Sequence, residues 1–573
     1  MKKITVILSV AMAVLASVAS DLETIRTRFC ELEIATKAIE GHISAKPQPV
    51  EKLLSTLSPD GSWSNIDYSD GDPSLWGPAI SHFGNLTVLV KEWYLKRDAK
   101  LEDAIHRSFG FWLEKDFKNS NWWWNQIGVP SYAGTVSILF NDALTDKERQ
   151  KAIEIMKRAQ FKMSGQNRIW LAKVNLMRAL VSNDEALAKK ASDVIGEELR
   201  LSNYEGIRAD WCFHQHGRQP QFGNYGLSYV GNMSRFAVLF ANTSLAFPEE
   251  KVMLLKNLIE QGYDWIIWKG YMDVPSLCRQ LFPGASRGKA KAIIGAKNTL
   301  KKAGIEFNPE PPVGFKYFHC SALGYYRTKN WMASVKMATT DIIGVETWIN
   351  GDNVLGGHMA DGALYTMVSG KEYEDIFPLW GNWRLIPGIT TYVNYKPVYQ
   401  NKPQGPKHFS EYGANWSNKV SGEKTATGGT VTMELKREGL VAQKKWEFSD
   451  SAILCTGEGI SSSDPNGEVV TCLEHSHAAA NVKIFKSPDG TTRALNGKIG
   501  YVIDAPCDDV HVAVEDRSGD FTRFMKSVKS KTVKGKVFVA YVKHGKKPEN
   551  AKYRYWVLPD TTEAKLKEFS TGK

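Results

Sequence analysis

The spacing of apolar residues predicts that the first half of the chain is helical. Between about residue 22 and about residue 305, apolar side chains recur at the interval expected along one face of an α-helix. Loops rich in Pro, Gly, Asn and Asp separate these segments. Helices of similar length joined by such loops favour an α/α array of hairpins, without a strict sequence repeat. The predicted helical segments are 22–39, 87–96, 101–113, 147–160, 170–180, 185–199, 229–241 and 251–265.

The pattern changes at a Pro-rich stretch, residues 307–314, where we place a domain boundary. Beyond it, short segments alternate apolar and polar residues between turns, which is typical of antiparallel β-sheet. We therefore predict an α+β protein with a helical domain over 21–310 and a β domain over 311–573. A last helix is expected at 562–569. The predicted strands are 331–338, 430–435, 467–473, 498–503, 510–514 and 536–542.

The first 20 residues have the composition of a secretory signal peptide. Lys2 and Lys3 precede an apolar run over 4–18, and small residues offer a cleavage site near Ser20. A membrane anchor would need a longer apolar span. We expect a secreted or periplasmic monomer without membrane insertion.

Charge and cysteine content narrow the possible partners and cofactors. The formal net charge of +11 suits a polyanion, and acidic polysaccharide is favoured over nucleic acid because no nucleic-acid-binding motif is found. The seven cysteines are scattered, with Cys30 alone near the start and the others from Cys212 onward. No spacing typical of a metal site built on Cys, and no nucleotide-binding or zinc-protease motif, is present. We expect neither a metal nor a cofactor in the reaction.

A run of tryptophans, within NWWWNQIGVP at 121–130, is the first candidate binding site. Three adjacent Trp cannot all lie on one face of a helix or strand, so we expect at least one of them to be exposed. An exposed indole is a flat apolar platform on which a sugar ring can stack. Asn121, Asn125 and Gln126 add hydrogen-bonding groups beside it. The alternative, in which all three indoles belong to the core, stays open.

The stretch GIRADWCFHQHGRQPQFGNYG, residues 206–226, contains His216 and Tyr225 among several glycines, which permit tight turns. An imidazole and a phenol held close together by such a turn can share proton transfer, so we predict this role for the pair. In SGQNR, Asn167 can present its amide to a ligand or act only as a helix cap. Arg279 and Arg287, in CRQLFPGASR, have the planar fork that suits carboxylate recognition. Taken alone, each of these residue types is more often an ordinary packing, capping or surface residue than a functional one.

Two further stretches, ETWINGDNVLGGHMAD and WGNWRLIPGIT, lie on the β side of the boundary. They include Glu346 and Asn350 and are dense in Asn, Gly and Trp, which indicates loops between strands. Such loops often contribute functional residues, although plain turn chemistry explains the composition equally well.

Together, in this order, these motifs resemble those of polysaccharide lyase family 8, which includes chondroitin AC, hyaluronate and xanthan lyases. The resemblance covers nearly the whole chain after the predicted signal peptide, including the late HGKKPENAKYRYWVLP. It implies an incomplete α/α toroid followed by an antiparallel β-sandwich. It also implies cleavage of a uronate-containing polysaccharide by β-elimination, with chondroitin or hyaluronan as the favoured substrate and unsaturated uronides as products.

The resemblance implies roles for the candidate residues. Asn167, His216 and Tyr225 match the family's catalytic Asn, His and Tyr, and Arg279 matches the first of its two catalytic arginines. Tyr225 would take the proton from C5 of the uronate and protonate the leaving oxygen. The remaining matches are Trp122 and Trp123 with Asn121 in the aromatic patch, Asn350 in the β domain, and Glu346 as an acidic partner.

Several features depart from the family pattern. Arg287 lies farther behind Arg279 than usual, and Glu346 is one residue out of register. We also expect the family's usual small C-terminal β domain to be absent. Alternatives therefore remain: a lyase acting on xanthan or another uronate polymer, or a non-catalytic carbohydrate-binding protein. A third is an α/α-toroid glycoside hydrolase, for which Asp210, Glu346 and Asp352 are the candidate carboxylates.

Overall fold

The computed structural model describes residues 21–36, 48–396 and 419–571. The predicted signal peptide, 1–20, lies outside them. The chain forms two compact units. Unit 1 comprises Met1–Arg200, Asn232–Leu254 and Thr299–Ile305, and unit 2 comprises Leu201–Gly231, Leu255–Asn298 and Glu306–Lys573. None of the described helices is both long enough and apolar enough to cross a bilayer.

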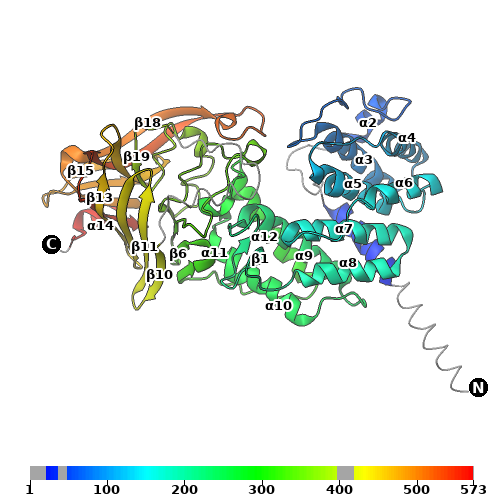
Figure 1. Cartoon of the computed structure of the whole chain (residues 1–573), viewed down its shortest axis with the longest axis horizontal. Coiled ribbons are helices and arrows are strands. Elements are labelled where there is room, and N and C mark those ends of the chain that lie inside the picture. The colour runs from blue at the N-terminus through cyan, green and yellow to red at the C-terminus, as the bar shows by residue number, and fades with distance from the viewer. Residues whose placement is uncertain (1–20, 37–47, 397–418, 572–573) are drawn as a thin grey trace, which may run out of the picture. The chain divides into compact units, whose positions relative to one another are not determined.

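Unit 1 is built from helices, as the periodicity predicts (Figure 1). Residues 21–35 are also helical. The named helices are α2 (Val50–Thr56), α3 (Gly77–Lys96), α4 (Ala99–Lys115), α5 (Val129–Leu139), α6 (Asp146–Met156), α7 (Gly165–Ser182) and α8 (Glu185–Glu197), with α9 (Leu227–Phe240) and α10 (Glu249–Asn257) mainly in this unit. Buried apolar faces hold them together; the rings of Phe83 on α3 and Trp112 on α4 lie 4.9 Å apart.

Local sequence explains the tight hairpins of unit 1. After α3, Arg97 adopts the left-handed conformation (φ 53°), and the next residue, Asp98, accepts hydrogen bonds from the first turn of α4. After α7, Asn183 (φ 52°) and Asp184 repeat this arrangement before α8. A left-handed residue ends one helix and an Asp side chain caps the next, so two residues are enough to reverse the chain.

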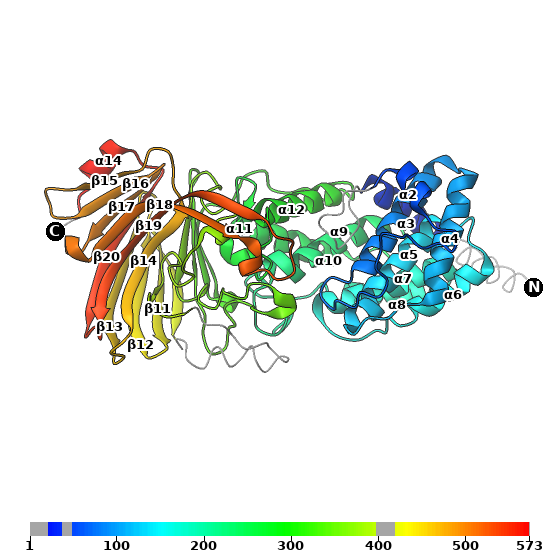
Figure 2. The same ribbon diagram turned by 90° about the horizontal axis from the view of Figure 1, so that it is seen from above.

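The described residues of unit 2 form three larger antiparallel sheets, in agreement with the predicted β region (Figure 2). The eight-stranded sheet has the order β10-β11-β12-β13-β20-β17-β16-β15, and two four-stranded sheets have the orders β18-β19-β14-β9 and β5-β6-β7-β8. Side chains from all three sheets share one core, among them Tyr326, Val431 and Phe538. The strands are β5 (Gly314–Phe318), β6 (Leu323–Arg327), β7 (Met332–Lys336), β8 (Ala363–Met367), β9 (Thr390–Tyr392), β10 (Val420–Thr425), β11 (Gly428–Arg437), β12 (Leu440–Phe448), β13 (Ile453–Ser462), β14 (Glu468–His477), β15 (Lys483–Lys486), β16 (Thr492–Asn496), β17 (Ile499–Asp504), β18 (Val510–Asp520), β19 (Thr532–Lys546) and β20 (Ala551–Pro559).

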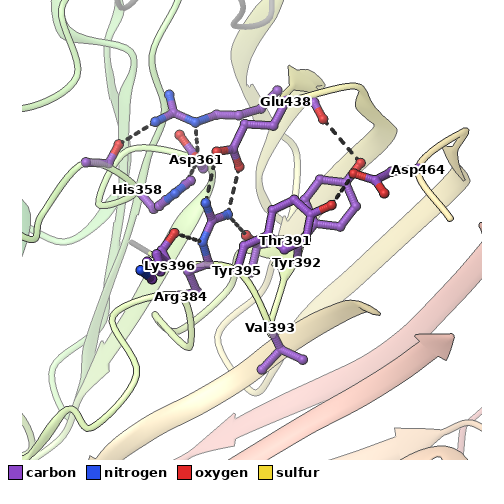
Figure 3. A network of polar contacts seen from close by, with 12 residues as sticks. His358, Asp361, Arg384, Thr391, Tyr392, Val393, Tyr395, Lys396, Glu438 and Asp464 are labelled. Atoms are coloured by element: carbon purple, nitrogen blue, oxygen red, sulfur yellow. Dashed lines mark hydrogen bonds and ion pairs between the residues drawn. The ribbon is translucent and has the colours of Figure 1, made fainter. Parts of the chain in front are cut away.

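A partly buried ion-pair network fastens a loop of unit 2 to the turn between β11 and β12 (Figure 3). Arg384 donates two parallel hydrogen bonds to Glu438, at 2.7 and 2.9 Å, and a third from Nε to the Lys396 carbonyl at 2.8 Å. Beside it, Asp361 accepts from His358 at 2.7 Å and pairs with Arg437. The planar guanidinium fits a carboxylate bidentately, which makes this contact rigid.

Some predicted boundaries change in the structure. All six predicted strands are present, and the last predicted helix corresponds to α14 (Glu563–Glu568). The single helix predicted over 251–265 is instead α10, a π-helical segment η3 (Leu258–Tyr263) and a short α11 (Asp264–Ile266). At Gly262 a Cβ atom would lie 2.4 Å from the carbonyl oxygen of Trp211, so close tertiary contact accompanies the change. The domain boundary at 310/311 stays a prediction.

Candidate active site

His216 and Tyr225 lie side by side in unit 2, on the segment that follows the short pair β1 (Gly206–Ile207) and β2 (Phe213–His214). Their ring centroids are 4.6 Å apart. His216 has a left-handed backbone (φ 60°), and Tyr225 lies in the π-helical turn η2 (Phe222–Gly226). Both side chains are partly exposed. The arrangement brings a phenol and an imidazole within reach of one ligand.

The glycines around Tyr225 are required by packing. A Cβ atom on Gly223 would lie 2.3 Å from the carbonyl oxygen of Ser276, and one on Gly226 would lie 2.6 Å from the Tyr263 hydroxyl. The backbone of η2 therefore lies directly against the segment around η4 (Val274–Leu277). This contact holds the Tyr225 backbone in place.

Glu346 is the centre of the polar contacts at this site. Its carboxylate is fully buried and accepts hydrogen bonds from His216 Nδ1 at 2.5 Å, from Gln221 Nε2 at 3.1 Å and from Arg279. The bond at Nδ1 orients the imidazole ring. Arg279 in turn lies 5.8 Å from the centroid of the Tyr225 ring. One carboxylate thus connects the imidazole with the guanidinium beside the phenol.

The charges at this site shift several pKa values. Burial alone would raise the pKa of Glu346, but the positive charge of Arg279 and the hydrogen bonds outweigh it and lower the pKa to about 2. Burial raises the pKa of the Tyr225 phenol, and the nearby Arg279 opposes this without cancelling it. Glu346 is therefore ionised at neutral pH, whereas Tyr225 is protonated.

A second set of contacts anchors the loop that contains Glu346. Asp352 pairs with Arg279 Nε at 3.4 Å and accepts a hydrogen bond from Ser527 at 2.6 Å. Asn353 donates from its side chain to the Glu346 carbonyl at 3.2 Å. Asn350 is exposed on the same loop, with a left-handed backbone (φ 56°). The loop therefore brings both Glu346 and Asp352 to Arg279.

Arg287 belongs to a different group of contacts. It lies in the first turn of α12 (Ala285–Lys301), is exposed, and donates hydrogen bonds to the Tyr271 hydroxyl at 3.0 Å and to Glu374 at 2.9 Å. Its described hydrogen bonds thus lead away from Glu346 and Arg279. The structure brings Arg279 to the His–Tyr pair through Glu346, and it gives Arg287 separate partners.

The aromatic patch lies in unit 1, where Trp122 is 39% exposed and Trp124 is buried. Trp123 is partly exposed and packs edge-on against Trp124 and Trp170, with centroids 5.0 and 5.7 Å apart. The expectation that at least one indole is exposed is confirmed, and the arrangement in which all three belong to the core is excluded.

The amides beside the tryptophans mostly support the local backbone. Asn125 exchanges two hydrogen bonds with the backbone of Asn119, at 3.0 and 2.6 Å. Asn121 donates to the Pro73 carbonyl at 2.8 Å and accepts from the backbone N–H of Trp123. Gln126 is partly exposed. These bonds indicate that Asn121 and Asn125 shape the patch.

Asn167, also in unit 1, lies in the first turn of α7 and is partly exposed. The turn is fixed by Glu198, which accepts from the Gly165 N–H at 3.0 Å and from Arg168 at 2.9 Å. Gly165 has a left-handed backbone (φ 57°), which glycine adopts without strain. Asn167 is thus held by a rigid helix end. Asn167 and the aromatic patch belong to unit 1, and the His–Tyr pair belongs to unit 2.

Comparison with known families accounts for both parts of the chain. The model of the N-terminal α-helical domain of polysaccharide lyase family 8 matches residues 34–305, and the model of the family's super-sandwich domain matches residues 313–570. The chain belongs to polysaccharide lyase family 8. It is therefore an enzyme of the polysaccharide lyase class, with the helical and antiparallel-sheet parts predicted from the sequence.

Known relatives of this lyase share most of its length. Chondroitinase-AC of Pedobacter heparinus is 29% identical over 550 residues, covering 89% of this chain and 76% of that protein. Hyaluronate lyase of Thermasporomyces composti is 22% identical and covers 96% of this chain and 80% of its own length. The solved structure of a chondroitinase AC lyase, studied as oligosaccharide complexes, has a TM-score of 0.83 at 26% identity. That match covers 96% of this chain and 85% of the other.

Two residues of the lyase site were not predicted from the sequence. Gln221, which donates to Glu346, lies within the His–Tyr stretch and could have been suspected from its position alone. Asp352, which pairs with Arg279, was considered only as a carboxylate of a glycoside hydrolase. Neither residue forms a recognisable motif, because their partners lie far away in the sequence.

Proposed function

We propose that this lyase cleaves uronate-containing glycosaminoglycans of the chondroitin or hyaluronan type by β-elimination, giving unsaturated uronide products. The observation that supports this most directly is Tyr225 beside a His216 that is oriented by the ionised Glu346. The net charge of +11 and the names of the relatives agree with an acidic polysaccharide substrate.

The chemistry of elimination explains why these groups are needed. The C5 proton of a uronate is α to a carboxylate, so its removal places further negative charge on an anion. We infer that Asn167 and His216 donate hydrogen bonds to that carboxylate and stabilise the charge as it develops. Tyr225 removes the C5 proton and then protonates the departing glycosidic oxygen. Arg279 lowers the cost of the phenolate through its positive charge.

Glu346 acts as a positioning residue in this scheme. It contacts His216 and Arg279, and through them it fixes the imidazole and the guanidinium beside the phenol. The same contacts argue against the glycoside hydrolase. Such an enzyme needs two carboxyl groups that face the substrate, whereas Glu346 and Asp352 are both buried and both paired with Arg279. Asp210, another candidate carboxylate, accepts two backbone hydrogen bonds.

The proposal is tested by incubating the enzyme with chondroitin sulfates, hyaluronan, heparan sulfate, alginate and xanthan. Unsaturated uronides absorb in the ultraviolet, so absorbance should rise with the first two polymers. Chain shortening without this absorbance would indicate hydrolysis, and binding without shortening would indicate a carbohydrate-binding protein. An absorbance increase with xanthan alone would show that the substrate is a uronate polymer other than a glycosaminoglycan.

The role of Tyr225 is tested with Tyr225→Phe. We expect kcat to fall at least about a hundredfold, the usual contribution of general acid–base catalysis, while polymer binding persists. Tyr541→Phe, in strand β19, is the matched control and should keep its activity. Near-normal turnover by Tyr225→Phe would refute the assignment of the phenol.

We also infer that the protein is exported, because the first 20 residues have the signal-peptide pattern, and we propose separately that it is a monomer. N-terminal sequencing of the mature protein from a cell that secretes it should begin just after Ser20. An intact N-terminus starting at Met1 would contradict export by this route, and sedimentation of a dimer would contradict the monomer.

A further inference from the structure

Four side chains of the kinds that bind metals gather in unit 2, apart from the contacts of Glu346. Asp210 and Cys212 follow β1, whereas His319 and Cys320 lie in the short turn η5 (His319–Ser321) between β5 and β6. Ligand atoms of Asp210, His319 and Cys320 all lie within 4.8 Å of one another. The thiol of Cys212 is hydrogen-bonded to the sulfur of Cys320.

The backbone holds the two segments together at this point. The Asp210 carboxylate accepts from the N–H of Cys212 at 3.1 Å and from the N–H of Cys320 at 2.7 Å. Nearby, His214 is hydrogen-bonded to Ser321 at 3.1 Å. The geometry of the cluster is therefore set by the fold, with little freedom for the segments to separate.

Solvent exposure increases across the cluster from Cys212 to His319, so an ion could enter it from one side. Cys212 is fully buried and Asp210 nearly so, Cys320 is partly exposed, and the side chain of His319 is 62% exposed. Nδ1 of His319 lies 3.9 Å from Oδ2 of Asp210, so a small side-chain movement brings both onto one ion. Solvent thus reaches the cluster from the His319 side.

We propose that Asp210, Cys212, His319 and Cys320 bind one divalent cation of the zinc type. Two sulfurs, an imidazole nitrogen and a carboxylate oxygen are a tetrahedral ligand set that Zn²⁺ prefers, and they are too soft for Ca²⁺ or Mg²⁺. With both thiols ionised, the set has three negative charges against the two positive charges of the ion. Arg208, which contacts Cys320, and Lys316, which interacts with Asp210, balance the excess.

The site would be structural. Asp210 and Cys212 lie on the same chain segment as His216 and Tyr225. His319 and Cys320 belong to the connection between β5 and β6. An ion bound by all four ligands would therefore fasten the catalytic segment to the sheet. The spacing of cysteines in the sequence predicted no metal site built on Cys. The two sulfurs are brought together only by the fold.

Cobalt substitution tests the proposal without relying on activity. Full-length protein, reduced and stripped of metal, is titrated with Co²⁺ and followed by absorption spectroscopy. We expect saturation at about one equivalent, with visible bands of tetrahedral cobalt and a sulfur-to-cobalt charge-transfer band, and displacement by Zn²⁺. Zn²⁺ should also raise the melting temperature, because it binds only the folded site.

Variants identify the ligands. Cys320→Ser should lose the charge-transfer intensity of one thiolate, and His319→Ala should weaken Co²⁺ binding at least about tenfold. The matched controls, Cys30→Ser in unit 1 and His511→Ala on β18, should bind Co²⁺ as the unmodified protein does. Absence of the cobalt bands would overturn the proposal. The proposal would also be overturned by a disulfide between these cysteines. In that case mass spectrometry of protein purified without reductant would show Cys212 linked to Cys320, and the reduced protein would bind no Co²⁺.

Discussion

Replacing Glu346 with Gln tests whether the buried carboxylate is held ionised by His216 and Arg279. The side chains are nearly the same size, so the change removes charge while leaving the packing largely intact. The pKa of Glu346 falls from its ordinary value of 4.5 to about 2 in the folded protein. At about 1.4 kcal/mol for each pKa unit, the ionised form contributes about 3 kcal/mol to folding at neutral pH.

The sign of the pH dependence follows from the direction of the shift. A carboxyl whose pKa is lower in the folded state stabilises the protein above its unfolded pKa, and this stabilisation is lost as pH falls through the folded pKa. For Glu346 the window runs from about pH 5 down to about pH 2. Glu346→Gln should therefore be about 3 kcal/mol less stable than the unmodified protein near pH 7, and this difference should shrink by about 2 kcal/mol near pH 3.

The assay is urea unfolding of the full-length protein at several pH values, followed by tryptophan fluorescence. Glu474→Gln is a control of opposite sign. Glu474 is also buried, but burial raises its pKa to about 7, so its ionisation lowers the stability of the unmodified protein as pH rises from about 4.5 to about 7. The stability of Glu474→Gln should therefore increase relative to that of the unmodified protein as pH rises over that range. A stability difference for Glu346→Gln that does not change with pH would refute the reasoning.

Further predictions concern activity and packing. Because burial raises the pKa of Tyr225, kcat/KM should increase with pH through the neutral range, and a flat profile would contradict a phenolate base. Trp122→Ala should raise KM with little change in melting temperature, whereas Trp124→Ala should cost about 3–5 kcal/mol of stability; equal melting temperatures would show that the buried indole is dispensable. Gly223→Ala should destabilise the protein by about 1–3 kcal/mol and reduce turnover, because the new Cβ meets the carbonyl of Ser276; unchanged melting and turnover would mean that the backbone yields freely.

The helices and strands could be predicted from the sequence because their signals are local. Apolar residues at helical spacing marked α3, α4 and α6 to α9, and alternating residues marked β7, β11, β14 and β17 to β19. Motifs such as FHQHGRQPQFGNYG were also recognisable within one stretch, and together they identified the family. These features depend on neighbours in the chain, which the sequence displays directly.

Only the tertiary structure decided which side chains share an environment. Glu346 meets His216, which is 130 residues away in the chain, and Asp210 accepts from Cys320, which is 110 residues away. The sequence alone could suggest Glu346 as an acidic partner, but its low pKa follows from burial beside Arg279. The π-helical break at Leu258–Tyr263 likewise lies where Gly262 packs against a distant carbonyl. Charge, burial and close packing depend on distances in space, whereas a residue pattern records distances along the chain.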